Sequence, residues 1–457
     1  MKTIYQLSSG FVFDANNMFG ASRLQEDDFK QVAAKAAAAA QGLAAIRQNC
    51  QAKGHLSKDG TPEPVCFTRL PFVVYGNPNT PATLQALLDY GAYARENFDI
   101  VIFCGIGGSY LGNKVLLESL GQQSTVKVVF AGNNLDGTAL EAVLAEAGKY
   151  KRVALIPISK SGTTIEPTVA FLYLYNELNK VADLHVEVAV VTDASHQEGP
   201  FNKLAQRYGW PLFDVPEGVG GRFSVLANPG LITAVVLGLD VPELLRGAAE
   251  MEALCQSEDW NKNPALFNAL TKYFAGSKYG ADIEVFMPYA MNLRALGEWY
   301  VQLLAESLGK RCDRQGRIVC YGRTPMVAVG STDMHAQTQQ HQDGKRNKII
   351  QFVEIGSKQG QVILEHSFTD IPEYAHLQGL DLDKALKAAL YANQEALSSD
   401  ERFNARYYLP KLNEYYLGQM FYFLMLSVAY EGELANVDAY DQPGVEIYKE
   451  IMHKKLQ

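Results

Sequence analysis

The chain has 457 residues, of which 47% are hydrophobic, and this size predicts two or three domains with large apolar cores. Its net charge of −9 argues against nucleic acid or an anionic membrane as the main partner. The N-terminus lacks a signal-peptide pattern, and the longest apolar tract, residues 420–430, is too short to span a bilayer. The six cysteines form no CxxC pair, which is typical of free thiols in a reducing cytosol. We therefore expect a cytoplasmic protein.

Strand and helix patterns alternate along most of the chain. Residues 25–50 are alanine-rich and predict a helix. A first series of apolar runs, separated by helical stretches, predicts strands at 99–104, 126–130, 153–158 and 186–191. A second series predicts strands at 283–287, 318–321, 326–329 and 349–355. From Asp381 onward the chain is predicted to be mostly helical.

These elements predict an α/β fold of two lobes, each with a parallel sheet flanked by helices, and packed C-terminal helices. We expect an N-terminal helical segment at 1–60, a first α/β lobe at 61–225, and a second lobe with the C-terminal helices at 226–457. The similarity of the two lobes suggests an old duplication.

A glycine-rich turn, Gly105-Ile-Gly-Gly-Ser-Tyr-Leu-Gly112, follows the first strand of the first series and opens a helix at 113–120. The glycines allow close backbone approach, and Ser109 adds a hydroxyl near the helix start. A dinucleotide-binding turn is the alternative. However, the glycine spacing is not G-x-G-x-x-G, and no clear acidic residue for a ribose follows the next strand.

A second turn of this kind, Ser159-Lys-Ser-Gly-Thr-Thr-Ile-Glu166, lies between the strand at 153–158 and a helix with Pro167 in its first turn. Four hydroxyls and Lys160 crowd a helix N-terminus, where backbone N–H groups and the helix dipole favour an anion. An N-cap is the simpler reading, but a cap needs only one or two hydroxyls. Two such turns at strand ends in one sheet predict a crevice for a phosphorylated ligand.

Arg222 stands in Gly220-Gly-Arg-Phe-Ser224, where paired glycines let a permanent charge approach a ligand. A turn arginine in solvent is an equal alternative.

Glu298, Gln302 and Glu306 recur every four residues and share one face of a predicted helix. A solvated polar stripe is the commoner cause of this spacing. However, Glu306 lies just before the Ser-Leu-Gly helix exit, and a partly buried carboxylate there suits a general base.

His335 follows the strand at 326–329 in Gly330-Ser-Thr-Asp-Met-His335, a position suited to proton transfer. Metal binding with His341 is the runner-up, but the spacing is not that of a helical zinc motif and no cysteine is near. A structural histidine bonded to a backbone carbonyl is a further alternative.

Near the C-terminus, Asp441-Gln-Pro-Gly-Val-Glu446 predicts a helix start, with Asp441 as N-cap and Pro443 in the first turn. Gln442 and Lys449, seven residues apart, point the same way from this helix. A surface helix with a solvated lysine is the alternative.

Together these segments closely resemble phosphoglucose isomerase, in its shorter bacterial form. The matching motifs lie at 105–112, 158–167, 220–224, 306–310, 330–335 and 441–449, in the order of the family. The resemblance implies two sugar-isomerase-type (flavodoxin-like) lobes and a homodimer that isomerises glucose 6-phosphate and fructose 6-phosphate through an enediolate, in glycolysis and gluconeogenesis. It calls for no redox cofactor and no metal. Leu308 is a departure, because the family more often has an acidic residue there.

The resemblance also implies a role for each site residue. Glu306 would move the proton between C2 and C1, Gln302 would contact the substrate, and Arg222 would stabilise the enediolate. His335, coming from the neighbouring subunit and oriented by Glu166, would open the sugar ring. Lys449 would assist ring opening, and Gln442 would line the site. The phosphate would be held by Gly108, Ser109, Ser159, Lys160, Ser161 and Thr164.

Two rival functions are left open. A sugar-phosphate sensor needs the phosphate turns but not the set of Glu306, His335, Arg222 and Lys449 together. A nucleotide-linked oxidoreductase built on the 105–112 turn needs an acidic residue for the ribose that the sequence does not clearly offer.

Overall fold

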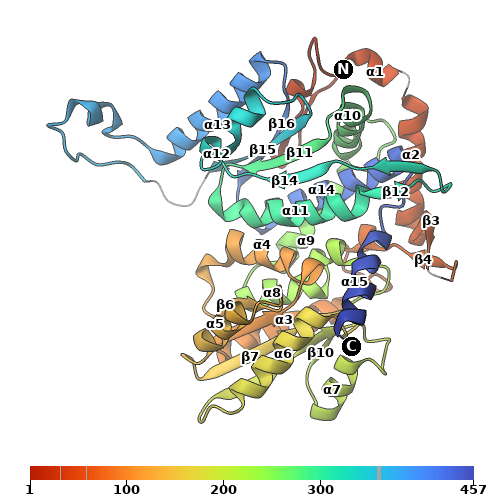
Figure 1. Cartoon of the computed structure of the whole chain (residues 1–457), viewed down its shortest axis with the longest axis vertical. Helices are drawn as coiled ribbons and strands as arrows, with labels where there is room; N and C mark the ends of the chain where they lie inside the picture. The colour runs from red at the N-terminus through yellow and green to blue at the C-terminus, as the bar shows by residue number, and fades with distance from the viewer. Residues whose placement is uncertain (31, 58, 358–361, 457) are drawn as a thin grey trace. The chain divides into compact units, whose positions relative to one another are not determined.

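The computed structural model describes residues 1–30, 32–57, 59–357 and 362–456, which form two compact units (Figure 1). Unit 1 comprises Met1–Gln41, Leu254–Leu417 and Leu426–Ala439. Unit 2 comprises Gly42–Ala253, Gly418–Met425 and Tyr440–Gln457. Each unit contains a sheet with parallel strands and several helices, which confirms the predicted α/β class. Among the described residues no helix is both long and apolar enough to cross a membrane.

The sheet of unit 2 has four parallel strands in the order β6-β5-β7-β8. Their bounds are β5 Ile100–Cys104, β6 Lys127–Ala131, β7 Arg152–Pro157 and β8 His185–Val188. Every residue of β5 is buried, as its unbroken apolar run requires of a central parallel strand. The predicted strand at 186–191 is divided, because β9 (Val190–Thr192) pairs with β10 (Leu212–Asp214) instead.

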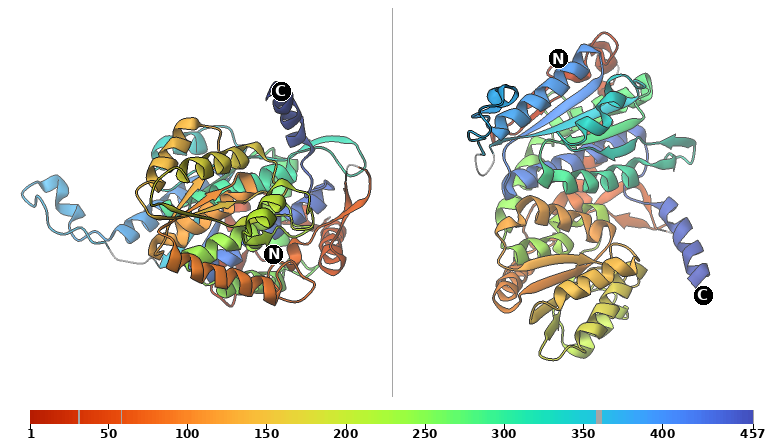
Figure 2. Two further views of the ribbon diagram at one scale, coloured as in Figure 1. Left: turned by 90° about the horizontal axis from the view of Figure 1, so that it is seen from below. Right: turned by 60° about the vertical axis from the view of Figure 1, so that its left-hand side comes forward.

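Eight helices lie in the described part of unit 2, and the second part of α2 (Ala33–Asn49) also belongs to it, whereas the start of α2 belongs to unit 1. The eight are α3 Pro81–Asn97, α4 Leu111–Leu120, α5 Gly137–Ala147, α6 Ile165–Leu178, α7 Pro200–Tyr208, α8 Asn228–Leu237, α9 Val241–Leu254 and α15 Pro443–Leu456. Helix α6 buries Phe171 and Leu174 against the face of the sheet that carries Ile102. By contrast, α15 buries none of its side chains and extends away from the other elements of unit 2 (Figure 2).

The sheet of unit 1 has six strands in the order β1-β2-β16-β15-β11-β14. Four are parallel: β11 Ile283–Pro288, β14 Thr324–Val327, β15 Lys348–Ser357 and β16 Phe403–Lys411. The hairpin of β1 (Ile4–Gln6) and β2 (Val12–Asp14) extends the sheet in antiparallel fashion. The remaining described helices are α1 Glu26–Lys30, α10 Pro264–Tyr279, α11 Arg294–Leu308, α12 Met334–Gln342, α13 Leu382–Ser399 and α14 Glu414–Ala435.

The structure confirms that the region after Asp381 is mostly helical, but this region also contains β16, a central strand of the sheet that the sequence analysis did not predict. The polar residues Asn404 and Arg406 interrupt the apolar pattern of β16. The strand accommodates them because Asn404 accepts a hydrogen bond from Asn17 and Arg406 donates one to Glu354. The predicted strand at 318–321 exists as β13, but it forms a separate hairpin with β12 (Lys310–Cys312). The segment 1–60 is not only helical, since it also contains β1, β2 and β3 (Gln51–Leu56), the last paired with β4 (Pro62–Pro64).

The parallel strands of the two units follow one topology. Numbered along the chain within each sheet, the order is 2-1-3-4 in both, from β6-β5-β7-β8 and from β14-β11-β15-β16. In this arrangement the strands stay parallel, but the order in which the chain adds them to the sheet reverses between the first and third strands, and ligands commonly bind at the carboxyl ends of the strands beside that point. The shared order is consistent with a duplication of one α/β lobe.

A buried group of charged residues lies under the sheet of unit 1. The carboxylate of Glu284 on β11 contacts Lys272 Nζ at 2.6 Å and Arg323 Nη2 at 2.9 Å. Arg323 continues to Glu431, with Nη2 2.7 Å from Oε2, and Tyr300 donates to Glu284 at 2.6 Å. Burial alone would raise the pKa of Glu284, but the charges of Lys272 and Arg323 outweigh it and lower that pKa to about 2.

We predict that Glu284→Gln lowers the free energy of unfolding by about 3–5 kcal/mol, because it leaves Lys272 buried without its carboxylate. The measurement is equilibrium denaturation, with the exposed Glu395→Gln on α13 as a matched control that changes stability little. Since the folded-state pKa is lowered, the contribution of Glu284 is fully present above its ordinary pKa of 4.5 and is lost as the pH falls toward 2. The variant should therefore lose less stability than the natural chain over that pH range.

Candidate active site

The turn after β7 is held in shape by its own hydroxyls. Ser159, only 3% exposed, accepts a hydrogen bond from the backbone N–H of Gly162 and donates to Thr164 Oγ1, both at 3.2 Å. Gly162 has φ +67°, a conformation that residues with a side chain rarely adopt. Thr164 is the N-cap of α6, but its side chain makes no capping bond. The N-cap explanation for the hydroxyls is therefore not supported, and the N–H groups at the start of α6 are not satisfied by Thr164.

The backbone of the turn after β5 lies close to the segment at 220–224, which carries Arg222. Gly107 lies in the left-handed region, with φ +56°. A Cβ built on Gly108 would stand 2.1 Å from the carbonyl oxygen of Gly221, so only glycine fits there. Ser224 fixes this approach, since its hydroxyl donates to the carbonyl of Gly221 at 2.7 Å. The glycines thus allow the turn after β5 to pack closely against the segment that carries Arg222, inside unit 2.

Strand pairing places the two turns at one edge of the sheet. Strand β5 pairs with β7 in register, with Cys104 opposite Pro157, and Ile158 N–H donates to the Cys104 carbonyl at 2.8 Å. A cavity of about 430 Å³ opens at this edge. The structure brings together there all six residues expected to hold a phosphate, namely Gly108, Ser109, Ser159, Lys160, Ser161 and Thr164.

Sequence reasoning missed two residues of this cavity, Asp193 and His196. They follow β9, which ends at Thr192, one residue beyond the predicted strand at 186–191. The carboxyl end of that predicted strand was the signal that could have pointed to them. This third turn supports the lysine, since the Thr192 hydroxyl and the Asp193 N–H both donate to the Lys160 carbonyl at 3.2 Å. Asp193 itself accepts from the Ser195 hydroxyl at 2.5 Å.

Arg222 is 2% exposed, so the alternative of a solvated turn arginine is wrong. Its Nη1 donates to Gln442 Oε1 at 2.9 Å and its Nη2 to the Asp441 carbonyl at 3.1 Å. Its neighbours Gly221 and Phe223 line a second cavity of about 680 Å³ in unit 2, together with Gln442. Two predicted site residues, far apart in sequence, are thus joined directly.

The two cavities of unit 2 share three lining residues, Lys160, Asp193 and Gly221. Lys160 therefore lies between the hydroxyl-rich turns and the two segments that carry Arg222 and Gln442. This arrangement suits an elongated ligand with a phosphate at one end and a centre that develops negative charge at the other.

The structure does not place Lys449 or Glu166 in either cavity of unit 2. Lys449 lies on the exposed helix α15, where its Nζ is 3.2 Å from Glu446 Oε1. Glu446 does line the larger cavity. Glu166 lies in the first turn of α6 and is partly buried.

The remaining predicted site residues, Gln302, Glu306 and His335, belong to unit 1. Gln302 Nε2 donates to Glu306 Oε1 at 3.0 Å, one turn apart on α11. Both side chains are partly buried, while Leu303 and Leu304 between them face the core. The stripe that includes Glu298 is therefore not a fully solvated one.

His335 lies exposed in the first turn of α12. The entry to this helix is fixed by Asp333, whose Oδ2 accepts from the Val329 N–H at 2.6 Å. His341 is at the other end of the same helix and buried. No group of three or more metal-binding side chains occurs in the part of the chain that the structure describes.

A sequence model of phosphoglucose isomerase matches residues 87–457. The chain belongs to the phosphoglucose isomerase family. It is 33% identical to the glucose-6-phosphate isomerase of Carboxydothermus hydrogenoformans, over 79% of this chain and 80% of that one. It is also 33% identical to that of Methanocaldococcus jannaschii, over 79% and 85%.

Solved structures agree on the fold. A hypothetical protein from Thermus thermophilus superposes with a TM-score of 0.81 at 28% identity, covering 98% of this chain and 99% of that one. A glucose-6-phosphate isomerase from Chlamydia trachomatis gives 0.82 at 20% identity, covering 98% and 89%. The predicted family and fold are confirmed.

We predict that Gly108→Ala weakens the binding of fructose 6-phosphate about tenfold or more, because the added Cβ pushes the Gly108 turn away from Gly221. Calorimetric titration measures this. Gly137→Ala is the matched control, since no atom lies within 4 Å of a Cβ at that position. Equal affinity in the two variants would contradict the role given to this close contact.

Proposed function

We propose that the chain catalyses the reversible isomerisation of glucose 6-phosphate and fructose 6-phosphate through a cis-enediolate, as a step of glycolysis and gluconeogenesis. Family membership supports this reaction. The observation that carries it is the cavity in which Lys160 and the hydroxyls of two strand-end turns converge, because every substrate of this reaction has a phosphate to anchor.

The phosphate is anchored in unit 2 by Gly108, Ser109, Ser159, Lys160, Ser161 and Thr164. Backbone N–H groups at the start of α6 and the charge of Lys160 favour a dianion there. Binding energy gained at this end, remote from the reacting carbons, holds C1 and C2 in place for the chemistry.

Glu306 is the base that removes the proton from one carbon and returns it to the other. Its bond from Gln302 supports this role, because that contact fixes the carboxylate and leaves the Gln302 Oε1, which is buried without a hydrogen-bond partner, for a substrate hydroxyl. As this proton moves from C2 to C1, the carbonyl moves the other way, from C1 to C2, and a second proton passes from O2 to O1. The negative oxygen of the intermediate needs a fixed positive charge. Arg222, held by Gln442, provides that charge.

Ring opening requires a proton donor and acceptor at the ring oxygen and the anomeric hydroxyl. We assign this step to His335, oriented by Glu166, with help from Lys449. These assignments rest on the family motifs. Lys449 is exposed on α15 and paired with Glu446, so its action requires the helix to be held by something beyond its own unit.

A homodimer would provide this. The segment 362–381 projects from unit 1 as an arm (Figures 1 and 2) and exposes Val362, Phe368 and Tyr374. Helix α15 likewise exposes Ile447, Tyr448 and Ile451. Apolar side chains gathered on projecting segments are typical of interfaces. We propose that His335 of the partner subunit completes each site.

The six cysteines are all free thiols, and Cys50, Cys104 and Cys255 are buried. This supports the predicted cytoplasmic location, since reducing compartments keep thiols unpaired.

The direct test of the function is turnover of fructose 6-phosphate in the presence of EDTA, followed as glucose 6-phosphate in a coupled assay. We predict that Glu306→Gln lowers kcat about 10²–10⁴-fold with little change in KM, because the base acts in the transition state. Glu298→Gln, two turns earlier on α11, is the matched control and should keep its activity. No turnover by the folded natural chain would rule out the isomerase, and binding without turnover would favour a sensor.

The shared site is tested by mixing two inactive variants, Glu306→Gln and His335→Asn, after dissociation and reassociation. If each site combines Glu306 of one chain with the partner subunit's His335, mixed dimers contain one intact site. Half of the dimers are mixed, so activity should rise to about a quarter of that of the natural protein. If both residues of a site came from one chain, mixing would restore nothing.

A further inference from the structure

A second polar cavity lies in unit 1, away from the predicted catalytic residues of that unit. It has a volume of about 180 Å³ and is bounded by the amino ends of β15 and β16 and by the segment that joins α12 to β15. His335 follows the carboxyl end of β14, so the cavity lies at the opposite edge of the same parallel sheet. Its polar lining residues are Ser22, Tyr279, His341, Lys345, Arg346, Lys348, Glu401 and Arg402.

The cavity carries an excess of positive charge. Asp400 is shared by two arginines, with Oδ1 2.7 Å from Arg346 Nη2 and Oδ2 2.7 Å from Arg402 Nε. Lys348 Nζ donates to the Lys345 carbonyl and to Asn347 Oδ1, both at 3.1 Å, and so to no carboxylate. Among the described residues neither Lys345 nor Lys348 forms an ion pair. Burial and then the charges of Arg402 and Lys345 lower the pKa of Lys348.

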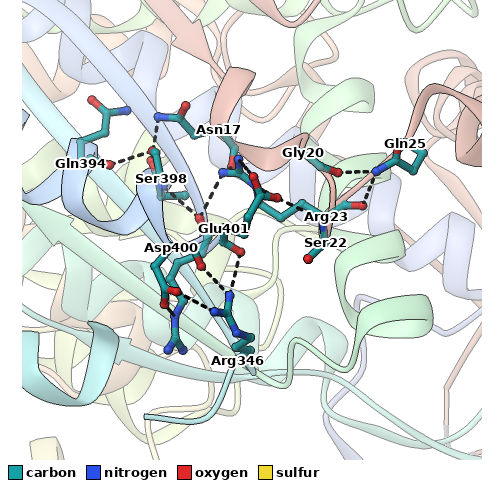
Figure 3. Close-up of polar contacts among 12 residues, drawn as sticks. Asn17, Gly20, Ser22, Arg23, Gln25, Arg346, Gln394, Ser398, Asp400 and Glu401 are labelled. Atoms are coloured by element: carbon teal, nitrogen blue, oxygen red, sulfur yellow. Dashed lines mark hydrogen bonds and ion pairs between the residues drawn. The ribbon is translucent and has the colours of Figure 1, made fainter. Parts of the chain in front are cut away.

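The one carboxylate that lines the cavity is already engaged. Glu401 accepts from Arg23 Nε and Nη2, both at 3.2 Å, and from the Ser22 N–H at 3.0 Å. Figure 3 shows this group, with Arg346 reaching Asp400 and the Glu401 backbone from the other side. Glu401 is therefore neutralised by Arg23, which leaves the two lysines uncompensated.

His341 closes the cavity from α12. The residue is 4% exposed, and its Nδ1 is buried without a hydrogen-bond partner. Burial, reinforced by the charge of Lys348, lowers the pKa of His341 to about 4, so its ring is neutral near pH 7. A buried ring nitrogen without a partner carries a desolvation cost that a bound ligand would remove. His341 Nδ1 would thus give a ligand a specific polar contact in addition to the positive charge of the cavity.

We propose that this cavity is a second anion-binding site, separate from the substrate site, which takes the phosphate group of a small molecule. Two ammonium groups, two guanidinium groups and an imidazole that can donate from Nδ1 match the several oxygens and the double charge of a phosphate. The volume admits a phosphate with a few atoms attached. A monoanion such as acetate satisfies fewer of these donors and should bind more weakly.

The test is equilibrium dialysis of the full chain against labelled inorganic phosphate. Because the substrate site also binds phosphate, the measurement uses a background of Ser159→Ala with Lys160→Gln, which weakens that site. This background chain should still bind phosphate. Adding Lys345→Gln and Lys348→Gln should weaken this binding about tenfold or more, since two charge-assisted contacts are lost. Adding Lys384→Gln and Lys411→Gln, two exposed lysines of unit 1, makes the same charge change and should have no effect.

The position of the bound phosphate is read from the His341 ring signals of a chain labelled in its histidines. These signals should shift on addition of phosphate to the background chain and to the Lys384/Lys411 control, but not to the Lys345/Lys348 variant. The proposal is overturned if the background chain binds no phosphate, if the Lys345/Lys348 variant binds it equally well, or if the His341 signals do not respond.

Discussion

The pairing of β5 with β7 is the constraint on which the site of unit 2 depends. These strands are separated by β6 in sequence, and their adjacency in the sheet is what makes the two turns after them neighbours. The contact from Ile158 N–H to the Cys104 carbonyl is the last bond before the turns diverge. Both strands are buried and apolar, so a slip in their register would move apolar side chains out of the core. The packing of the core thereby fixes the spacing of the residues proposed to hold the phosphate.

The two units share one topology but differ in the side chains at the strand ends. In unit 2 the strand-end turns carry hydroxyls, glycines and Lys160, and they leave a cavity. In unit 1 the corresponding turn after β11 carries Tyr289, whose ring would lie 2.5 Å from a Cβ on Gly330. The space is thus filled by an aromatic ring, and polar chemistry lies instead on α11 and at the start of α12. On the proposed function, one copy of the lobe anchors the substrate and the other provides proton transfer.

Local patterns explain which features could be predicted from the sequence. The turn at 159–164 lies between a buried strand and a helix start only a few residues away, so a phosphate site could be proposed there without tertiary information. The residues that escaped prediction depend on distant partners. Strand β16 was missed because Asn404 and Arg406 are satisfied by residues elsewhere in the chain. Asp193 and His196 reach the cavity only because β9 runs beside β7. The bond between Arg222 and Gln442 spans 220 residues and left no local signal.

On the proposed function, the turns at the ends of β5 and β7 select phosphorylated sugars. The most direct measurement is the ratio of kcat/KM for fructose 6-phosphate to that for fructose, in the natural chain and in a chain with Ser159→Ala and Lys160→Gln. We expect the ratio to fall about 100-fold or more in the variant, because the lost contacts are made by the phosphate alone, while kcat/KM for fructose stays the same. An unchanged ratio would contradict it.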